Sequence, residues 1–275
     1  MISIDQSAGR TTNLKRGRGT VAYDVQGSGP LVICVPGMGD LRSSYRFLVP
    51  QLLAAGYRVA TLDLRGHGES STRFDSFDDV ALASDVVALA QELGGPAVLV
   101  GNSMGAGAAV IAAAEHPELV ASLVLIGPFV RDVAPFPGAA LVMRIALLRP
   151  WGPRVWKAFH RRMFVSTPPA DYDEYQRKLM TSLTRPGAWR ALQQTTRTSH
   201  QPAEESLAHV NVPTLVVMGT ADPDFKSPSD EAAFVASELK GEVVLVPNSG
   251  HYPHAECPEV VGESLTTFLQ DVARG

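Results

Sequence analysis

The sequence has no long apolar run and only two cysteines. No apolar stretch reaches the roughly 18 residues that a membrane span requires, and the first residues, MISIDQSAGRTTN, lack the apolar core of a signal peptide. Cys34 and Cys257 are far apart, and Cys34 lies inside the apolar run LVICV, which favours a buried thiol over a disulfide framework or a metal site. We therefore expect a cytoplasmic protein that uses no metal and no cofactor.

The chain also lacks a strong excess of charge of one sign. It has 24 Lys and Arg against 28 Asp and Glu, a net charge of −4. This balance gives no excess of positive charge that would indicate binding to nucleic acid or to an anionic membrane surface. A small molecule is therefore the expected partner. With 275 residues, 45% of them apolar, the chain can bury a sizeable core as one large domain, or as one domain with an insertion. Its oligomeric state is not readable.

Short β-rich runs alternate with longer segments of helical periodicity. The runs typical of strands are 20–26, 31–35, 57–62, 97–100, 120–126, 212–218 and 242–246. The segments typical of helices are 43–55, 78–93, 104–115, 228–239 and 258–272. Continuous apolar strands separated by amphipathic helices indicate a parallel sheet covered on both faces. The sequence therefore predicts an α/β fold with a mostly parallel central sheet.

This alternation stops between residues 131 and 208, a segment called the insert below. The insert is rich in Pro, Trp and Arg, and its pattern is typical of several short helices. It contains 12 Lys and Arg against 6 Asp and Glu, so its charge is opposite to that of the rest of the chain. We expect residues 1–130 and 209–275 to form the core domain and the insert to form a helical lid. Its positive charge suits an anionic substrate, or arginines that face solvent or pair with the acidic core.

The stretch VGNSMGAG places Ser103 between an apolar strand and an Ala-rich helix. Glycine disfavours a helix interior by about 1 kcal/mol, so Gly101 and Gly105 need another explanation. A nucleophile elbow supplies one, because its glycines let the strand and helix approach closely while a strained turn presents the serine hydroxyl. The five-letter pattern arises by chance too often to stand alone. The alternative is a glycine-rich turn with an inert serine.

A serine hydroxyl is a poor nucleophile until a base removes its proton, and the base needs an orienting acid. Asp222 and His251 each follow a later apolar run, 214–218 and 243–246 respectively. The chain order Ser, Asp, His is the one expected for this architecture.

Three other residues compete for these roles. Asp132 is a rival acid, because it follows the preceding strand. His254 lies three residues after His251 and is interpreted as a residue of the pocket edge or the surface. His67, in RGHGES, is interpreted as structural.

Five motifs in this order resemble the α/β-hydrolase superfamily over nearly the whole chain: VPGMGD, DLRGHGES, GNSMGAG, MGTADP and SGHYPHAECPE. The resemblance implies that Ser103 is the nucleophile and that His251 is the general base and then the general acid. It also implies that Asp222 orients and stabilises His251.

The resemblance further implies an oxyanion hole made by the backbone N–H groups of Met38 and Met104. The family usually has His-Gly where this chain has Pro36-Gly37. Because the donor is a main-chain N–H, the hole can survive this change.

The chemistry implied is that of a serine hydrolase acting through an acyl-enzyme on a small or medium, partly apolar ester or a related acyl substrate. GNSMG also resembles hydrolases that cleave carbon–carbon bonds, and similar elbows occur in cofactor-free haloperoxidases that make peracids. A weakly catalytic ligand receptor on the same fold is a third possibility. We expect activity to rise with pH through an ionisation near that of a free histidine, about 6.5.

Overall fold

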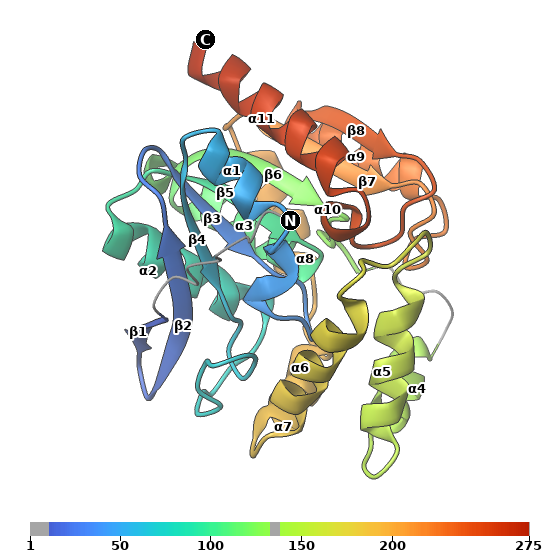
Figure 1. The fold of residues 1–275 in the computed structure, drawn as a ribbon. Helices are drawn as coiled ribbons and strands as arrows, with labels where there is room; N and C mark the ends of the chain where they lie inside the picture. The colour runs from blue at the N-terminus through green and yellow to red at the C-terminus, as the bar shows by residue number, and fades with distance from the viewer. Residues whose placement is uncertain (1–10, 133–137, 275) are drawn as a thin grey trace, which may run out of the picture.

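The computed structural model describes residues 11–132 and 138–274. In this part of the chain, eight strands form one sheet in the order β1-β2-β4-β3-β5-β6-β7-β8 (Figure 1). The strands are β1 Thr12–Arg16, β2 Gly19–Gln26, β3 Leu31–Val35, β4 Arg58–Leu62, β5 Ala97–Asn102, β6 Val120–Ile126, β7 Thr214–Gly219 and β8 Glu242–Val246. β2 is antiparallel to both β1 and β4, and every other pairing is parallel. The predicted mostly parallel sheet is confirmed.

Helices cover both faces of this sheet, which explains why its central strands are apolar throughout. β3, β5 and β7 are buried at every residue. One face packs against α1 (Val49–Ala54) and α11 (Pro258–Arg274). The other face packs against α2 (Asp79–Leu93), α3 (Met104–Glu115) and α9 (Pro228–Leu239).

Two local features differ from the sequence-based expectation. β1 was not predicted, because TNLKR carries a single apolar residue; it forms the edge of the sheet through a hairpin with β2 that turns at Gly17, where φ is +55°. The helix predicted over 43–55 is two elements, a 3₁₀ turn at Arg42–Tyr45 and then α1. Pro50 lies in the first turn of α1, where its fixed φ favours a helix start.

The described part of the insert follows β6 and contains short helices. These are α4 Ala139–Ala146, α5 Gly152–Arg162, α6 Tyr172–Thr184, α7 Ala188–Thr195 and α8 Gln201–Ser206. α4 to α7 lie below the core in Figure 1 and surround a small apolar cluster that includes Trp156, Leu179 and Trp189 and that Leu41, from the loop after β3, also joins. α8 instead packs on the core through Ala203. The boundaries at 131 and 208 stay a prediction.

No helix within the described ranges combines the length and the hydropathy needed to cross a membrane.

Candidate active site

Ser103 occupies a sharp turn between β5, which ends at Asn102, and α3, which begins at Met104. Its φ of 54° and ψ of −124° lie in a region that non-glycine residues rarely adopt, and such strain is typical of functional turns. A Cβ at Gly105 would come within 2.3 Å of the Val35 carbonyl oxygen. A Cβ at Gly101 would come within 2.4 Å of the Gly105 oxygen, so both contacts require glycine.

Asp222 and His251 form a buried hydrogen-bonded pair at the ends of two neighbouring strands. Asp222 follows β7 and His251 follows β8, and the Nδ1 of His251 lies 2.7 Å from the Oδ2 of Asp222. Their side chains are almost entirely excluded from solvent. Because a carboxylate only accepts, Nδ1–H of His251 donates this bond, which leaves the lone pair of Nε2 free to accept a proton.

Asn102 connects this pair to the elbow. Its Nδ2 donates to the backbone oxygens of Ile126, at 3.0 Å, and of His251, at 3.2 Å. The backbone N–H of Ser103 donates to the same Ile126 oxygen. The loop that carries His251 is therefore held against the residue that precedes Ser103.

The electrostatic surroundings of His251 favour its protonated form. Burial lowers the pKa of His251, but the charge and the hydrogen bond of Asp222, together with the charges of Asp224 and Asp40, outweigh this effect. The net result raises the pKa of His251 to about 9, above the free-histidine value expected from the sequence. The reason is that three carboxylates surround the ring, of which sequence reasoning had assigned only one.

The loop after β3 lies directly beside Ser103. A Cβ on Gly37 would lie 3.0 Å from the Cβ of Ser103. The N–H of Met38 has no acceptor within the described ranges. Met104 is the first residue of α3, so its N–H has no partner inside the helix. Two free N–H groups beside the serine are what an oxyanion hole needs, but their roles stay a prediction.

Three side chains from outside this loop hold its second half. Gly39, at φ +70°, donates its N–H to Nε2 of His67, at 3.1 Å. The other ring nitrogen of His67 donates to a backbone oxygen in its own loop, which agrees with its structural interpretation. Trp156 of α5 packs on Gly39, where an added Cβ would lie 2.0 Å from its ring. The hydroxyl of Tyr175 in α6 donates to the carboxylate of Asp40.

The rival residues have other partners. Asp132 accepts hydrogen bonds from the N–H of His200, at 2.9 Å, and from the hydroxyl of Ser199, at 2.7 Å, so it supports the start of α8. His254 is fully buried and stacks on Tyr45 with ring centroids 4.8 Å apart, so it is not a surface residue. Burial lowers the pKa of His254 to about 3 and keeps the ring neutral.

Sequence reasoning missed Asp40, Tyr175 and the closeness of Asp224. Asp40 is 1% exposed, and burial raises its pKa to about 6 although the Tyr175 hydrogen bond lowers it. Asp40 lies in the motif VPGMGD and was therefore visible in the sequence. The sequence around Tyr175 gave no indication that its hydroxyl bonds to Asp40, 135 positions away.

Asp222, Asp224 and His251 also form a cluster of side chains of the types that bind metal ions. The donor atoms of Asp222, Asp224 and His251 lie within 4.8 Å of one another. The Nδ1 of His251 is already a hydrogen-bond donor to Asp222, and a protonated nitrogen cannot coordinate a metal. The cluster therefore fits a histidine base better than a metal site.

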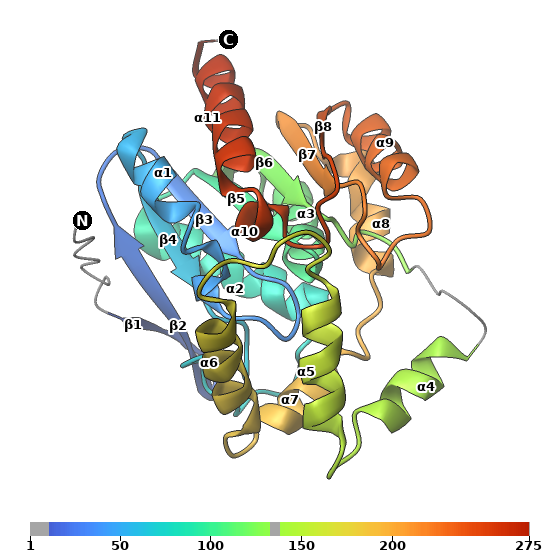
Figure 2. The same ribbon diagram turned by 45° about the vertical axis from the view of Figure 1, so that its right-hand side comes forward.

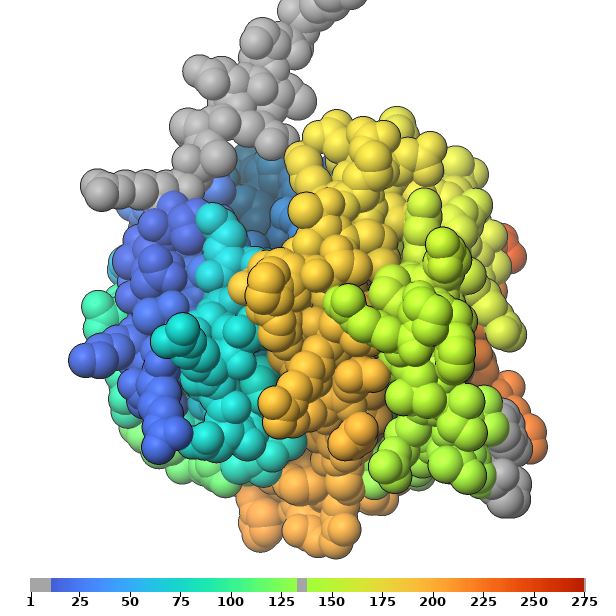
Figure 3. Space-filling view, turned by 90° about the horizontal axis from the view of Figure 1, so that it is seen from below, coloured from blue at the N-terminus to red at the C-terminus, as the bar shows by residue number. Residues whose placement is uncertain are grey.

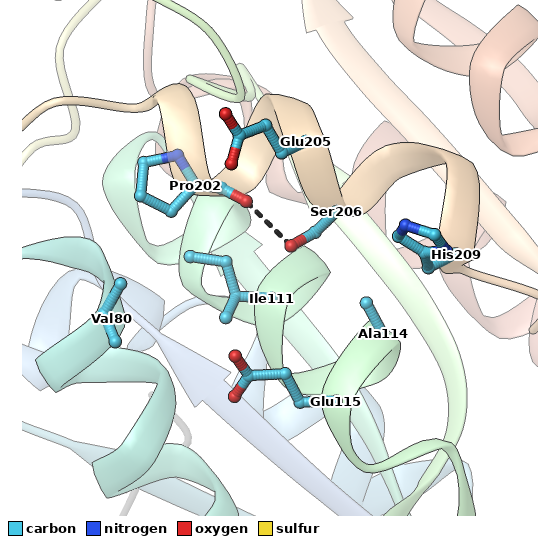
Figure 4. Close-up of a pocket in the computed structure, with 8 residues that line it drawn as sticks. All are labelled: Val80, Ile111, Ala114, Glu115, Pro202, Glu205, Ser206 and His209. Carbon is cyan, nitrogen blue, oxygen red and sulfur yellow. Dashed lines mark hydrogen bonds between the residues drawn. The ribbon is translucent and has the colours of Figure 1, made fainter.

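A separate surface groove of about 340 Å³ lies between α2, α3 and α8 (Figure 4). It is lined by Val80, Ile111, Ala114, Glu115, Pro202, Glu205, Ser206 and His209. Its only internal hydrogen bond drawn in the figure runs from the hydroxyl of Ser206 to the Pro202 oxygen. None of the predicted site residues lines this groove.

Comparison with known proteins agrees with this fold. Residues 32–263 match the model of the alpha/beta hydrolase family, so the chain belongs to that family. It is 30% identical to the pimeloyl-[acyl-carrier protein] methyl ester esterase of Neisseria meningitidis, over 87% of this chain and 92% of that protein. It is 28% identical to the 2-(acetamidomethylene)succinate hydrolase of Mesorhizobium japonicum, over 98% and 97% of the two chains. A bromoperoxidase from Bacillus anthracis has the same fold, with a TM-score of 0.82, 20% identity and coverage of 94% and 99%.

The family and its esterase-named relatives make this protein an α/β-hydrolase with hydrolase chemistry.

Proposed function

We propose that the protein is a serine hydrolase that cleaves a small or medium, partly apolar ester or a related acyl substrate. The observation that carries this proposal is the strained Ser103 turn beside a buried His251–Asp222 pair. The esterase relative at 30% identity supports the same substrate class.

The reaction would proceed in two halves. Nε2 of His251 takes the proton of the Ser103 hydroxyl while its oxygen attacks the substrate carbonyl, and the N–H groups of Met38 and Met104 stabilise the oxyanion. Collapse expels the alcohol, which receives the proton from His251, and leaves an acyl-serine ester. Water then gives a proton to His251 and attacks this ester, and collapse releases the carboxylic acid while His251 returns the proton to the Ser103 oxygen. Asp222 holds the ring and stabilises its cation in both halves.

A substrate panel tests the proposal and separates it from its alternatives. The panel contains short and long acyl esters, a lactone, a vinylogous diketone acid for carbon–carbon cleavage, and a bromination assay with hydrogen peroxide, acetate and bromide. We expect ester turnover by the wild type and none by Ser103→Ala. Turnover of the diketone acid alone, or bromination alone, would favour the corresponding alternative chemistry. Binding without turnover of any substrate would favour a ligand receptor.

The pH profile is expected to report the carboxylates around His251. A protonated ring cannot accept the serine proton, so kcat/KM should rise with pH through an ionisation near 9, the pKa to which these charges raise the ring. Initial rates of hydrolysis of a p-nitrophenyl ester between pH 6 and pH 10 measure it. Asp40→Asn removes one of these charges and should move the ionisation to lower pH. An ionisation at 6.5 in both proteins would contradict this account.

The hydrogen bond from Tyr175 to Asp40 is expected to position the loop of Met38. In Tyr175→Phe the buried carboxylate loses this donor and the loop can shift, and a misplacement of about 1 Å can cost about 100-fold. We expect kcat for a short acetyl ester to fall about 10- to 100-fold with a smaller change in KM.

The matched control is Tyr172→Phe, in the same helix. Its hydroxyl bonds to His160 and Gln176, both within the insert. This variant should keep its kcat. Equal losses in the two variants would point to a general loosening of the insert.

A further inference from the structure

Helix α4 presents apolar side chains to solvent along its whole length. None of its residues is buried, and Leu141, Val142 and Ile145 are 60%, 53% and 52% exposed. A surface helix of a globular protein normally turns its apolar stripe towards the core. An outward stripe of this kind marks a surface that contacts another apolar phase.

The exposed surface continues beyond α4 into the start of α5. The indole N–H of Trp151 donates to the Ile145 carbonyl oxygen at 3.0 Å, so the ring lies against the end of α4. Val155 follows Trp151 by one turn. Leu148, Trp151 and Val155 are each more than a third exposed. These residues form the apolar patch, which comprises Leu141, Val142, Ile145, Leu148, Trp151 and Val155.

The patch lies on the outer side of the insert. Figure 2 shows α4 standing away from α6 and α7 and next to α5, and Figure 3 shows the insert at the surface when the molecule is viewed from below.

The charged residues of the segment that carries the patch are all of one sign. Residues 138–170 contain six Lys and Arg and no Asp or Glu. Arg144, Arg149 and Arg154 are exposed, and they form no ion pair with any residue in the described part of the chain. The insert pairs made by Arg131 with Glu231 and by Lys178 with Glu174 lie outside this stretch. A local cationic surface therefore exists on a chain whose net charge is negative.

We propose that the apolar patch and its arginines dock the protein on an anionic phospholipid bilayer, with α4 lying in the plane of the interface. Interfacial helices combine these parts, namely Leu and Trp on one side and Arg or Lys around them. A second copy of the chain is a poorer occupant, because a two-fold contact would bring two sets of unpaired arginines together. The expectation of no membrane partner came from the charge of the whole chain, in which the acidic core masks the insert.

Docking is measured without substrate, so its test is independent of the proposed hydrolase activity. Vesicles of phosphatidylcholine alone are compared with vesicles containing one third phosphatidylglycerol. Co-sedimentation gives the bound fraction, and tryptophan emission reports the environment of Trp151, because Trp156 and Trp189 are each only 3% exposed. We expect binding to the anionic vesicles, weakened by salt, with a blue shift that Trp151→Phe abolishes.

Variants separate the apolar and the electrostatic contributions. Leu141→Ser with Ile145→Ser should weaken binding about tenfold or more, since interfacial affinity scales with buried apolar area. Arg144→Gln should weaken it about fivefold on anionic vesicles and leave it unchanged on neutral ones. The matched control is Leu245→Ser on β8, where the leucine is 40% exposed, and it should bind like the wild type.

Three outcomes would overturn the proposal. They are no sedimentation with either vesicle, equal binding to neutral and anionic vesicles, and an equal loss in the Leu245→Ser control. Concentration-dependent dimers that disappear in the Leu141→Ser, Ile145→Ser variant, without vesicle binding, would assign the patch to a second copy instead.

Discussion

Ser103→Ala is expected to lose about 10⁶-fold in kcat on every ester that the wild type hydrolyses. The loss is this large because the catalytic residues act as a unit, so that removing the nucleophile alone costs nearly as much as removing all three. Residual turnover would come from the oxyanion hole and from substrate binding. Initial rates on a p-nitrophenyl ester measure the loss, and the intact mass after treatment with a fluorophosphonate probe shows whether the covalent site is gone.

A buried serine in the sheet provides the control for this change. Ser122 lies on β6, is fully buried and has a hydroxyl without a partner within the described ranges, so Ser122→Ala also removes one serine hydroxyl, but away from the Ser103 turn. This variant should keep its rate and its single probe adduct. Persistent labelling of Ser103→Ala would move the nucleophile to another residue.

Asp222→Asn is expected to lose about 10⁴-fold in kcat on all substrates. The amide that replaces the carboxylate cannot hold His251 in the tautomer that leaves Nε2 unprotonated, nor stabilise the imidazolium that forms. The 2.7 Å bond between Oδ2 of Asp222 and Nδ1 of His251 is the interaction that the substitution removes. Steady-state kinetics on short and long esters measure the effect.

Asp132→Asn is the matched comparison, because Asp132 is the other acid that follows a strand. Its carboxylate bonds to Ser199 and His200 at the start of α8, so its loss should change activity only modestly. A large loss of activity in Asp132→Asn with a modest loss in Asp222→Asn would instead assign the catalytic acid to Asp132, after the earlier strand. Far-UV circular dichroism of both variants distinguishes lost chemistry from lost structure.

Much of the fold could be predicted because its signals are local. Strands buried on both faces must be apolar throughout, and helices between them must show a 3.6-residue period. β1 lacked this signal, because an exposed edge strand needs only backbone pairing and tolerates the polar run TNLKR. The elbow at Ser103 was visible for a similar reason, since the close approach of strand and helix restricts Gly101 and Gly105 to glycine.

Contacts between distant segments could not be predicted in this way. Asp40 and Tyr175 each look ordinary in their own segments, and only the packing of the insert on the loop after β3 brings them together. The same holds for His251, whose pKa depends on carboxylates from two other loops. His254 was misread because its burial depends on Tyr45, more than two hundred residues earlier in the chain.

The sequence by itself determined the family, the parallel sheet and the residues proposed for catalysis, because each of these leaves a short pattern of apolar spacing, glycine or motif order in the chain. The tertiary structure alone decided the electrostatics of His251, the side chains that hold the loop after β3, and the outward face of α4. These properties depend on distances between segments far apart in the chain, and on which side chains packing leaves without a partner. Neither is encoded in any local stretch.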